Sequence, residues 1–156
     1  MAAEWRIVEG GLDDPRVQAL LAVQHSRSRE VTAPGFAFAL DLDGLRAPGI
    51  RLFTGWEGEQ AVGTGALKPL DAGHAEVKSM HTAETARRRG VGTAMLARIV
   101  AEARAAGMGR LSRETGTAAY FQPAVAIYLK VGFVPCGPFG DYAASAENRF
   151  LALALG

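Results

Sequence analysis

Apolar residues recur at three- and four-residue steps in several stretches of this chain, which is the spacing of helices that cover a core on one side. The expected helices span residues 15–29, 91–106 and 123–131, with a short helical turn at 41–46. Asp14 and Pro15 open the first helix, whereas Gly107 and Gly132 follow the ends of the two later ones. The chain therefore contains three amphipathic helices that need a core to cover.

Runs of β-branched and aromatic residues between polar turns predict strands in the remaining stretches. The expected strands cover residues 5–8, 50–56, 61–67, 76–82, 110–115, 133–136 and 148–155. Strands and helices together follow the order β-α-α-β-β-β-α-β-α-β-β, which mixes hairpins with two β-α-β crossovers. We therefore expect an α/β fold in which one mixed sheet carries helices on its faces.

The composition is that of an ordinary globular protein, and a single domain spanning residues 1–156 is expected. The net charge of +1 gives little support for a nucleic-acid-binding protein. The single cysteine, Cys136, excludes an internal disulfide, and the histidines His25, His74 and His81 form no metal-binding pattern. No apolar run resembles a signal peptide or a membrane span, so we expect a cytoplasmic protein. Fourteen arginines against three lysines are typical of a GC-rich bacterial gene.

Three consecutive arginines, Arg87, Arg88 and Arg89, stand where the central helix begins, directly before the run Gly90–Thr93. Positive charge is unfavourable at the N-terminus of a helix unless an anion binds there. The glycines let the backbone approach such an anion, which successive N–H groups then face. A P-loop needs a lysine that is absent here, and a dinucleotide fingerprint needs a small residue where Met95 stands. The loop therefore predicts a pyrophosphate site of another kind.

The run R-R-R-G-V-G at 87–92 resembles the acetyl-CoA motif [RQ]-x-x-G-x-[GA] of the GCN5-related N-acetyltransferases. A second signature of that family, a helical tyrosine followed by Gly-Phe, is similar to Tyr128 with residues 132–133. The resemblance is densest over residues 75–133. It implies the acyl-CoA N-acyltransferase fold, a mostly antiparallel mixed sheet with a parallel, splayed central strand pair and flanking helices. It also implies acetyl-CoA as the cofactor, with CoA as a product.

The resemblance assigns cofactor binding to the glycine loop and to the strand before it. The cofactor-binding residues expected on this basis are Met80, His81, Thr82, Arg87, Arg88, Arg89, Gly90, Val91, Gly92 and Thr93. The strand is expected to pair with the pantetheine amides like an added strand, and a bulge in it to offer a backbone N–H to the oxyanion. The family often has asparagine where Phe121 stands, so here the placement of the pantetheine arm relies on backbone groups.

Catalysis needs a base for the attacking amine and an acid for the departing thiolate. Glu76 lies eleven residues before Arg87, the offset at which the histone-acetylating branch of the family places its base. Strand alternation puts Lys78 on the same face as Glu76, so a structural ion pair is the alternative, with Glu114 as the reserve base. Tyr128 is expected to protonate the CoA thiolate, the alternative being a half-buried aromatic with a satisfied hydroxyl.

These residues predict an acetyl-CoA-dependent N-acetyltransferase acting on a small-molecule or amino-acid-like amine by direct attack in a ternary complex. The alternatives are a catalytically silent CoA-binding sensor or partner module and, last, a nucleic-acid-binding domain. A small-molecule amine is the expected partner, without nucleic acid or membrane, and a homodimer is compatible with the sequence. The acceptor is expected between the segment 24–45 and the loop 139–142, where charges of both signs leave its own charge open.

Overall fold

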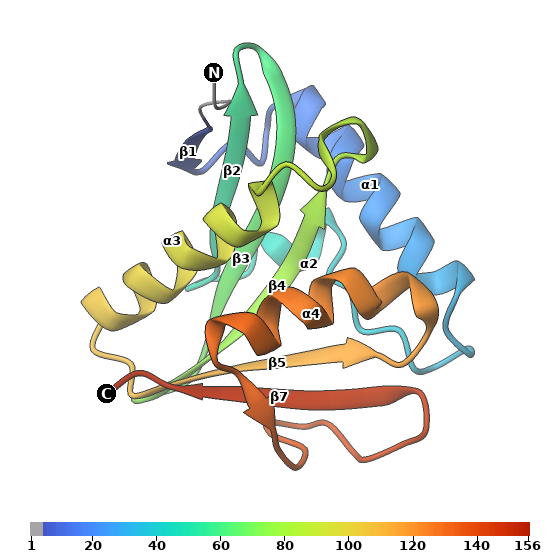
Figure 1. Cartoon of the computed structure of the whole chain (residues 1–156), viewed down its shortest axis with the longest axis vertical. Helices are drawn as coiled ribbons and strands as arrows, with labels where there is room; N and C mark the ends of the chain where they lie inside the picture. Colours follow the sequence, from blue (N-terminus) through green and yellow to red (C-terminus); the bar gives the residue numbers. More distant parts are fainter. Residues whose placement is uncertain (1–4) are drawn as a thin grey trace.

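The computed structural model describes residues 5–156, which form one mixed seven-stranded sheet with helices on both faces (Figure 1). The strands are β1 (Arg6–Glu9), β2 (Arg51–Glu57), β3 (Gln60–Asp71), β4 (His74–Thr82), β5 (Arg110–Gly116), β6 (Val134–Pro135) and β7 (Asn148–Ala154). Their order in the sheet is β1-β2-β3-β4-β5-β7-β6. Every neighbouring pair is antiparallel except β4 and β5, which are parallel. The expected fold class is confirmed.

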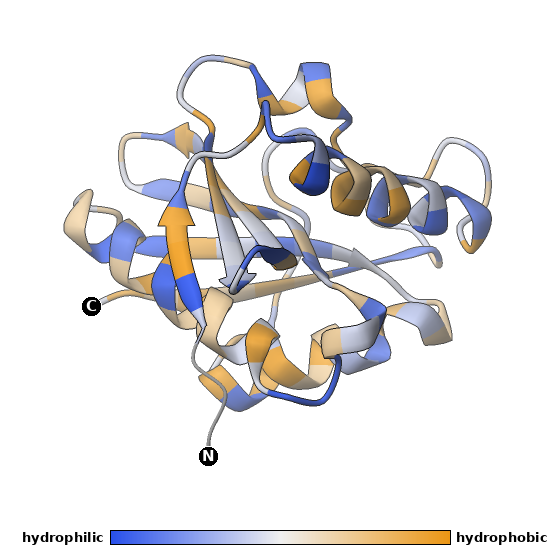
Figure 2. Cartoon of the chain, turned by 90° about the horizontal axis from the view of Figure 1, so that it is seen from above, coloured by the Kyte–Doolittle hydropathy of each residue, from blue (hydrophilic) through white to orange (hydrophobic). Residues whose placement is uncertain are grey.

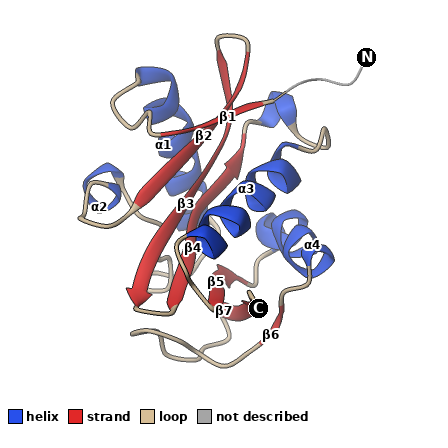
Figure 3. Cartoon of the chain, turned by 90° about the vertical axis from the view of Figure 1, so that its left-hand side faces the viewer, coloured by secondary structure: helices blue, strands red, loops and turns tan. Residues whose placement is uncertain are grey.

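Helices cover the sheet in two layers, with α1 and α2 on one face and α3 and α4 on the other (Figure 3). The α-helices are α1 (Pro15–Glu30), α2 (Leu42–Leu45), α3 (Val91–Ala105) and α4 (Gln122–Val131). Short 3-10 turns at Glu84–Ala86 and Ala119–Phe121 precede α3 and α4. Asp14 caps α1 and Gly132 ends α4 with a φ of 119°, so both helix ends agree with the predictions.

Three strand predictions differ from the structure by two or more residues, and β4 begins at His74, two residues before its predicted start. β3 continues to Asp71, although Pro69 has no backbone donor for the ladder. The strand accommodates that proline through a register irregularity between Pro69 and Asp71. β6 is reduced to Val134–Pro135, because it pairs with β7 only at the edge of the sheet. These ends depend on pairing between strands, which local sequence preference does not determine.

Helix α3 packs closely on β3 and places the glycine loop at the edge of the core. Its apolar stripe is buried, and polar positions alternate with apolar ones along the helices (Figure 2). A Cβ atom at Gly63 would lie 2.7 Å from Val91, and one at Gly65 would lie 2.6 Å from Ile99. The glycines of β3 therefore allow the helix to approach the sheet at this short distance.

The parallel strands β4 and β5 separate after a short paired stretch. His74–Glu76 pairs with Arg110–Ser112, and beyond that point the two strands diverge (Figure 1). A bulge in β4 accompanies the separation, because Ser79 has a φ of 55° and the register with β3 shifts around Gly65. The Thr64 hydroxyl donates to the Ser79 carbonyl at 2.8 Å and holds the bulge in place. The expected splayed strand pair is present, and it opens the sheet at its centre.

Candidate active site

A cavity of about 500 Å³, here called the large cleft, lies where β4 and β5 diverge. The end of β4, the residues 86–88 and 90–93 and one side of α4 border it. Of the ten residues expected to bind the cofactor, all line this cleft except Arg89. The glycine loop and the strand before it therefore meet at one cavity.

The side chain of Arg89 points to the β2–β3 hairpin. Its guanidinium donates to the Glu57 carboxylate at 2.6 and 3.3 Å and lies 5.0 Å from the centroid of the Trp5 ring. Arg88, with a φ of 63°, turns the chain so that consecutive arginines face different directions. The expectation that the charge of Arg89 serves an anion in the cleft is therefore not supported.

The first turn of α3 opens into the large cleft without a side-chain cap. Gly90 is the N-cap residue with a φ of 90°, and the first turn contains no acidic side chain. A Cβ atom at Gly92 would lie 2.9 Å from Ile127, which lines the opposite wall. The free N–H groups, the positive end of the helix dipole and the nearby Arg87 and Arg88 side chains suit a diphosphate anion.

His81 contributes no positive charge to the cleft. Burial, followed by the positive charge of Arg87, lowers the pKa of His81 to about 4. The imidazole is therefore neutral near pH 7, and the cationic side chains that line the cleft are Arg87, Arg88 and Arg113.

Tyr128 forms part of the floor of the large cleft with its hydroxyl free. The side chain is 0% exposed, and its ring packs edge-on against Phe133 with the centroids 5.4 Å apart. Among residues 5–156 the hydroxyl has no hydrogen-bond partner. Burial raises the pKa of Tyr128, which keeps its proton in place. The alternative of a half-buried tyrosine with a satisfied hydroxyl does not fit this geometry.

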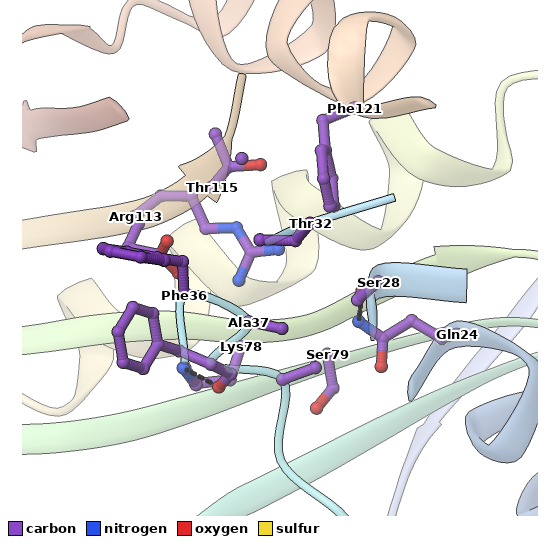
Figure 4. A pocket seen from close by; sticks show the side chains of 14 residues that line it. Gln24, Ser28, Thr32, Phe36, Ala37, Lys78, Ser79, Arg113, Thr115 and Phe121 are labelled. Atoms are coloured by element: carbon purple, nitrogen blue, oxygen red, sulfur yellow. Dashed lines mark hydrogen bonds between the residues drawn. The ribbon is translucent and has the colours of Figure 1, made fainter. Parts of the chain in front are cut away.

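A second cavity of about 30 Å³, here called the small pocket, adjoins the large cleft (Figure 4). It is bordered by α1, the segment 32–39 and the diverging ends of β4 and β5. The residues that line both cavities are Gln24, Ser28, Arg113, Thr115 and Phe121. The N-terminal segment expected to receive the acceptor does border this pocket, whereas the loop 139–142 does not line it.

Glu76 is held in a buried polar chain behind the small pocket. The Tyr142 hydroxyl donates to Glu76 Oε2 at 2.5 Å, and Lys78 Nζ donates to Tyr142 Oη and to the Phe38 carbonyl, both at 2.9 Å. Lys78 Nζ lies 3.5 Å from Glu76 Oε2, and the two side chains are 3% and 1% exposed. Burial lowers the pKa of Lys78. The geometry favours the structural ion pair over the base, because Glu76 lines neither cavity.

Glu114 is the carboxylate that lines the small pocket. Asn148 Nδ2 donates to this carboxylate, and burial raises the pKa of Glu114. A raised pKa brings the group closer to the range in which a general base works near neutral pH. The reserve candidate of the sequence thus has the better position for an acceptor.

Residues 17–133 match the family model of the acetyltransferase (GNAT) family. The chain belongs to this family. The GNAT protein is 45% identical over 144 residues to the uncharacterized N-acetyltransferase YedL of Escherichia coli, covering 92% of this chain and 91% of YedL. It is 40% identical over 136 residues to the uncharacterized N-acetyltransferase YsnE of Bacillus subtilis, covering 86% and 90%. It is also 40% identical over 113 residues to the IAA acetyltransferase of Azospirillum brasilense, covering 72% of each chain.

Solved structures share the fold of this GNAT acetyltransferase. A candidate acyl-CoA N-acyltransferase of Klebsiella pneumoniae superposes with a TM-score of 0.82 at 22% identity, covering 99% of each chain. YncA of Salmonella typhimurium, solved with its cofactor acetyl-CoA, gives 0.72 at 14% identity, covering 97% of this chain and 94% of YncA. The family membership makes the chain an acetyl-CoA-dependent acetyltransferase with bacterial relatives.

Two polar residues of this acetyltransferase line both cavities, and only Gln24 lies in the segment 24–45 expected for the acceptor. Arg113 is 8% exposed, lines both cavities and donates to the Val77 carbonyl at 2.8 Å across the diverging strands. Gln24 lies on the buried stripe of α1 and also lines both cavities. The sequence signal for Arg113 is a charged residue within a predicted strand. For Gln24 it is an amide on the apolar face of a predicted helix. Phe121, the departure from the family pattern, lines both cavities and packs its ring on Gly116.

Within residues 5–156, no group of three or more His, Cys, Asp or Glu side chains is placed to hold a metal ion. Among the helices of the same residues, none is both long enough and apolar enough to cross a membrane.

Proposed function

We propose that this enzyme transfers the acetyl group of acetyl-CoA to the amine of a small-molecule or amino-acid-like acceptor, by direct attack in a ternary complex within one catalytic domain. The observation that carries the proposal is the contact between the two cavities at five shared residues, with the free hydroxyl of Tyr128 beside it. Two substrates can therefore occupy adjoining spaces at the same time. Cys136 lines neither cavity, which leaves no cysteine nucleophile in position for a covalent route.

Acetyl-CoA brings the acetyl group as a reactive thioester when it is bound. The residues of the large cleft hold it: the free N–H groups of the first turn of α3 and the side chains of Arg87 and Arg88 bind the diphosphate. Residues 80–82 of β4 supply backbone groups for the pantetheine amides along the edge that faces β5, because the opposite edge pairs with β3 and the pairing with β5 ends at Glu76. Binding thus depends more on backbone than on side chains.

Glu114 acts as the base in this proposal, directly or through a water molecule. It lines the small pocket, whereas Glu76 lies behind that pocket with its carboxylate on Tyr142. Burial raises the pKa of Glu114, which strengthens it as a proton acceptor. Glu76 becomes a positioning residue, because it fixes Tyr142 and Lys78 at the rear of the pocket.

Tyr128 delivers the proton that the CoA thiolate needs on departure. Its hydroxyl is buried, has a raised pKa and has no hydrogen-bond partner within residues 5–156, so its proton is available on the cleft side. The β4 bulge at Ser79 supplies the oxyanion donor, since a bulged residue leaves a backbone group out of the ladder. We assign this donor to the backbone N–H of Met80.

The experiment is the release of free thiol from acetyl-CoA across a panel of amines, with the acetylated product identified by mass spectrometry. IAA belongs in the panel because a relative at 40% identity carries it in its name. We expect acceptor-dependent release of one thiol per acetylated amine. A catalytically silent CoA-binding module would bind CoA without turnover of any amine, and that result would replace the proposal with the sensor alternative.

A further inference from the structure

The buried polar atoms without a hydrogen-bond partner gather around the two cavities. Within residues 5–156 they are Gln24 Oε1, Ser79 Oγ, Arg113 Nε, Thr115 Oγ1 and Tyr128 Oη. Each belongs to a residue that lines the large cleft, the small pocket or both. An unpaired buried polar group costs about 1–3 kcal/mol, so such groups concentrate where a ligand supplies the missing partner. Tyr128 already has a role in the transfer, and the other four surround the small pocket.

Arg113 is the cation of the small pocket that forms no salt bridge within residues 5–156, with Glu114 and Glu76 as the nearby carboxylates. Its guanidinium makes one hydrogen bond, from Nη1 to the Val77 carbonyl, and forms no ion pair with the carboxylates of residues 5–156. The other cation that lines the pocket, Lys78, lies 3.5 Å from Glu76 and bonds to two further oxygens. Figure 4 shows the Arg113 guanidinium pointing from β5 toward the middle of the pocket. Since arginine stays charged when buried, this site favours an anionic ligand.

We propose that Arg113 binds the carboxylate of the acetyl acceptor, so that the enzyme acts on amino acids or other amino carboxylates. This inference rests on the proposed acetyl transfer to an amine. The small pocket measures about 30 Å³, and a single water needs roughly 10–15 Å³ by the same measure, so the pocket suits a carboxylate group. The Ser79 and Thr115 hydroxyls, both buried and unpaired, add neutral donors to the same site. Glu114 lines the same pocket and carries the charge opposite to that of the acceptor's ammonium group.

A structural role for Arg113 is the competing explanation. The guanidinium bridges the diverging strands through Val77 and lies 5.7 Å from the centroid of the Tyr128 ring. A purely structural arginine would affect all acceptors equally when it is replaced. A carboxylate-binding arginine discriminates between acceptors, because planar guanidinium and carboxylate groups form paired hydrogen bonds.

The test compares L-amino acids with their matching amides as acceptors for the wild-type enzyme and for Arg113→Gln and Arg113→Lys. For the wild type, we expect kcat/KM to favour the acid over its amide by about 10–100-fold, the range of one charged hydrogen-bonded contact. In Arg113→Gln this preference should disappear, and Arg113→Lys should retain part of it. An equal loss for acids and amides, or a wild type that prefers amides, would overturn the proposal.

Calorimetric titration separates this inference from the acetyl transfer on which it rests. Wild type and Arg113→Gln, both saturated with CoA, are titrated with the same acids and amides, so no turnover is needed. Binding of an acid but not its amide to the wild type, lost in Arg113→Gln, supports the carboxylate site even where no thiol is released. Absence of binding by any acid, or equal binding by both proteins, refutes the site. The wild-type comparison of acid and amide holds even if Arg113→Gln does not fold.

Discussion

The large cleft and the small pocket are built from different parts of the chain and in different ways. The large cleft takes its anion-binding groups from one continuous segment, 86–93, and most of those groups are backbone N–H. The small pocket takes side chains from α1, the segment 32–39, β4 and β5, which lie far apart in the sequence. A site made of local backbone leaves a short motif, whereas a site made of distant side chains leaves none. That difference explains why the cofactor was readable from the sequence and the acceptor was not.

The largest expected effect belongs to Tyr128, which stands next to the contact between the two cavities. Replacement Tyr128→Phe should lower kcat by about 10²–10⁴-fold, because it removes the proton donor for the thiolate. The affinity for acetyl-CoA and the melting temperature should stay nearly unchanged, since the deleted hydroxyl has no partner in residues 5–156. Thiol release, CoA titration and thermal unfolding of the variant measure the three quantities. A marked loss of stability with normal kcat would show that the hydroxyl is structural.

Glu114 and Glu76 provide the next test, because one lines the small pocket and the other lies behind it. Glu114→Gln should lower kcat/KM by about 10²-fold and remove the acid limb of its pH profile, which follows a carboxyl whose pKa is raised by burial. Glu76→Gln should instead cost stability, about 3 kcal/mol, because it leaves Lys78 as an uncompensated buried charge. Rate profiles and urea unfolding of both variants distinguish the roles. A loss of rate in Glu76→Gln together with a loss of stability in Glu114→Gln would indicate that Glu76 is the base.

His81 provides a test of charge in the large cleft through the pH dependence of stability. Its pKa of about 4 in the folded protein lies below the ordinary value of 6.5, so its contribution is fully present above pH 6.5 and is lost as the pH falls through 4. The wild type should lose about 3 kcal/mol more than His81→Gln between pH 7 and pH 4. Urea unfolding at both pH values gives the difference. If both proteins lost the same free energy of unfolding between pH 7 and pH 4, the pKa of His81 would not be lowered in the folded protein, and the imidazole would be charged in the native cleft.

The smallest expected effect separates neighbouring arginines of the same run. Arg88→Ala should weaken acetyl-CoA binding by about 5–10-fold, since Arg88 lines the large cleft and one charged contact is worth about 1 kcal/mol when partly exposed. Arg89→Ala is the matched control, because Arg89 pairs with Glu57 outside the cleft. The affinity of Arg89→Ala for acetyl-CoA should differ from that of the wild type by less than twofold. Equal weakening by both changes in a calorimetric titration would return Arg89 to the anion site.

The parts of the fold that the sequence predicts are those with local signals. The α1 start at Asp14, the α3 stripe and the Gly132 stop all follow from spacing and capping within a few residues. The strand ends that were predicted wrongly depend on pairing between segments that are distant in the sequence. β3 extends through Pro69 because β4 is there to pair with it, and no local preference would place a proline in that strand.

The candidate site follows the same rule. The cofactor loop was readable because its anion-binding groups belong to one turn of helix. The geometry disfavours Glu76 as base through a contact that local sequence does not reveal, because Tyr142, 66 residues away, donates to its carboxylate and Glu76 lines neither cavity. Arg113 was not predicted as a site residue, because it lines a cavity only where β4 and β5 diverge. The sequence does not show that divergence.

The central claim is that both substrates occupy adjoining cavities at once, and an initial-rate matrix tests it most directly. Rates are measured at several fixed concentrations of the acceptor that the thiol-release panel identifies, while acetyl-CoA is varied. Direct transfer in a ternary complex predicts double-reciprocal lines that intersect, with no acetyl group left on the enzyme by mass spectrometry. Parallel lines together with an acetylated protein would contradict the account, because they would require a covalent step that the two cavities do not contain.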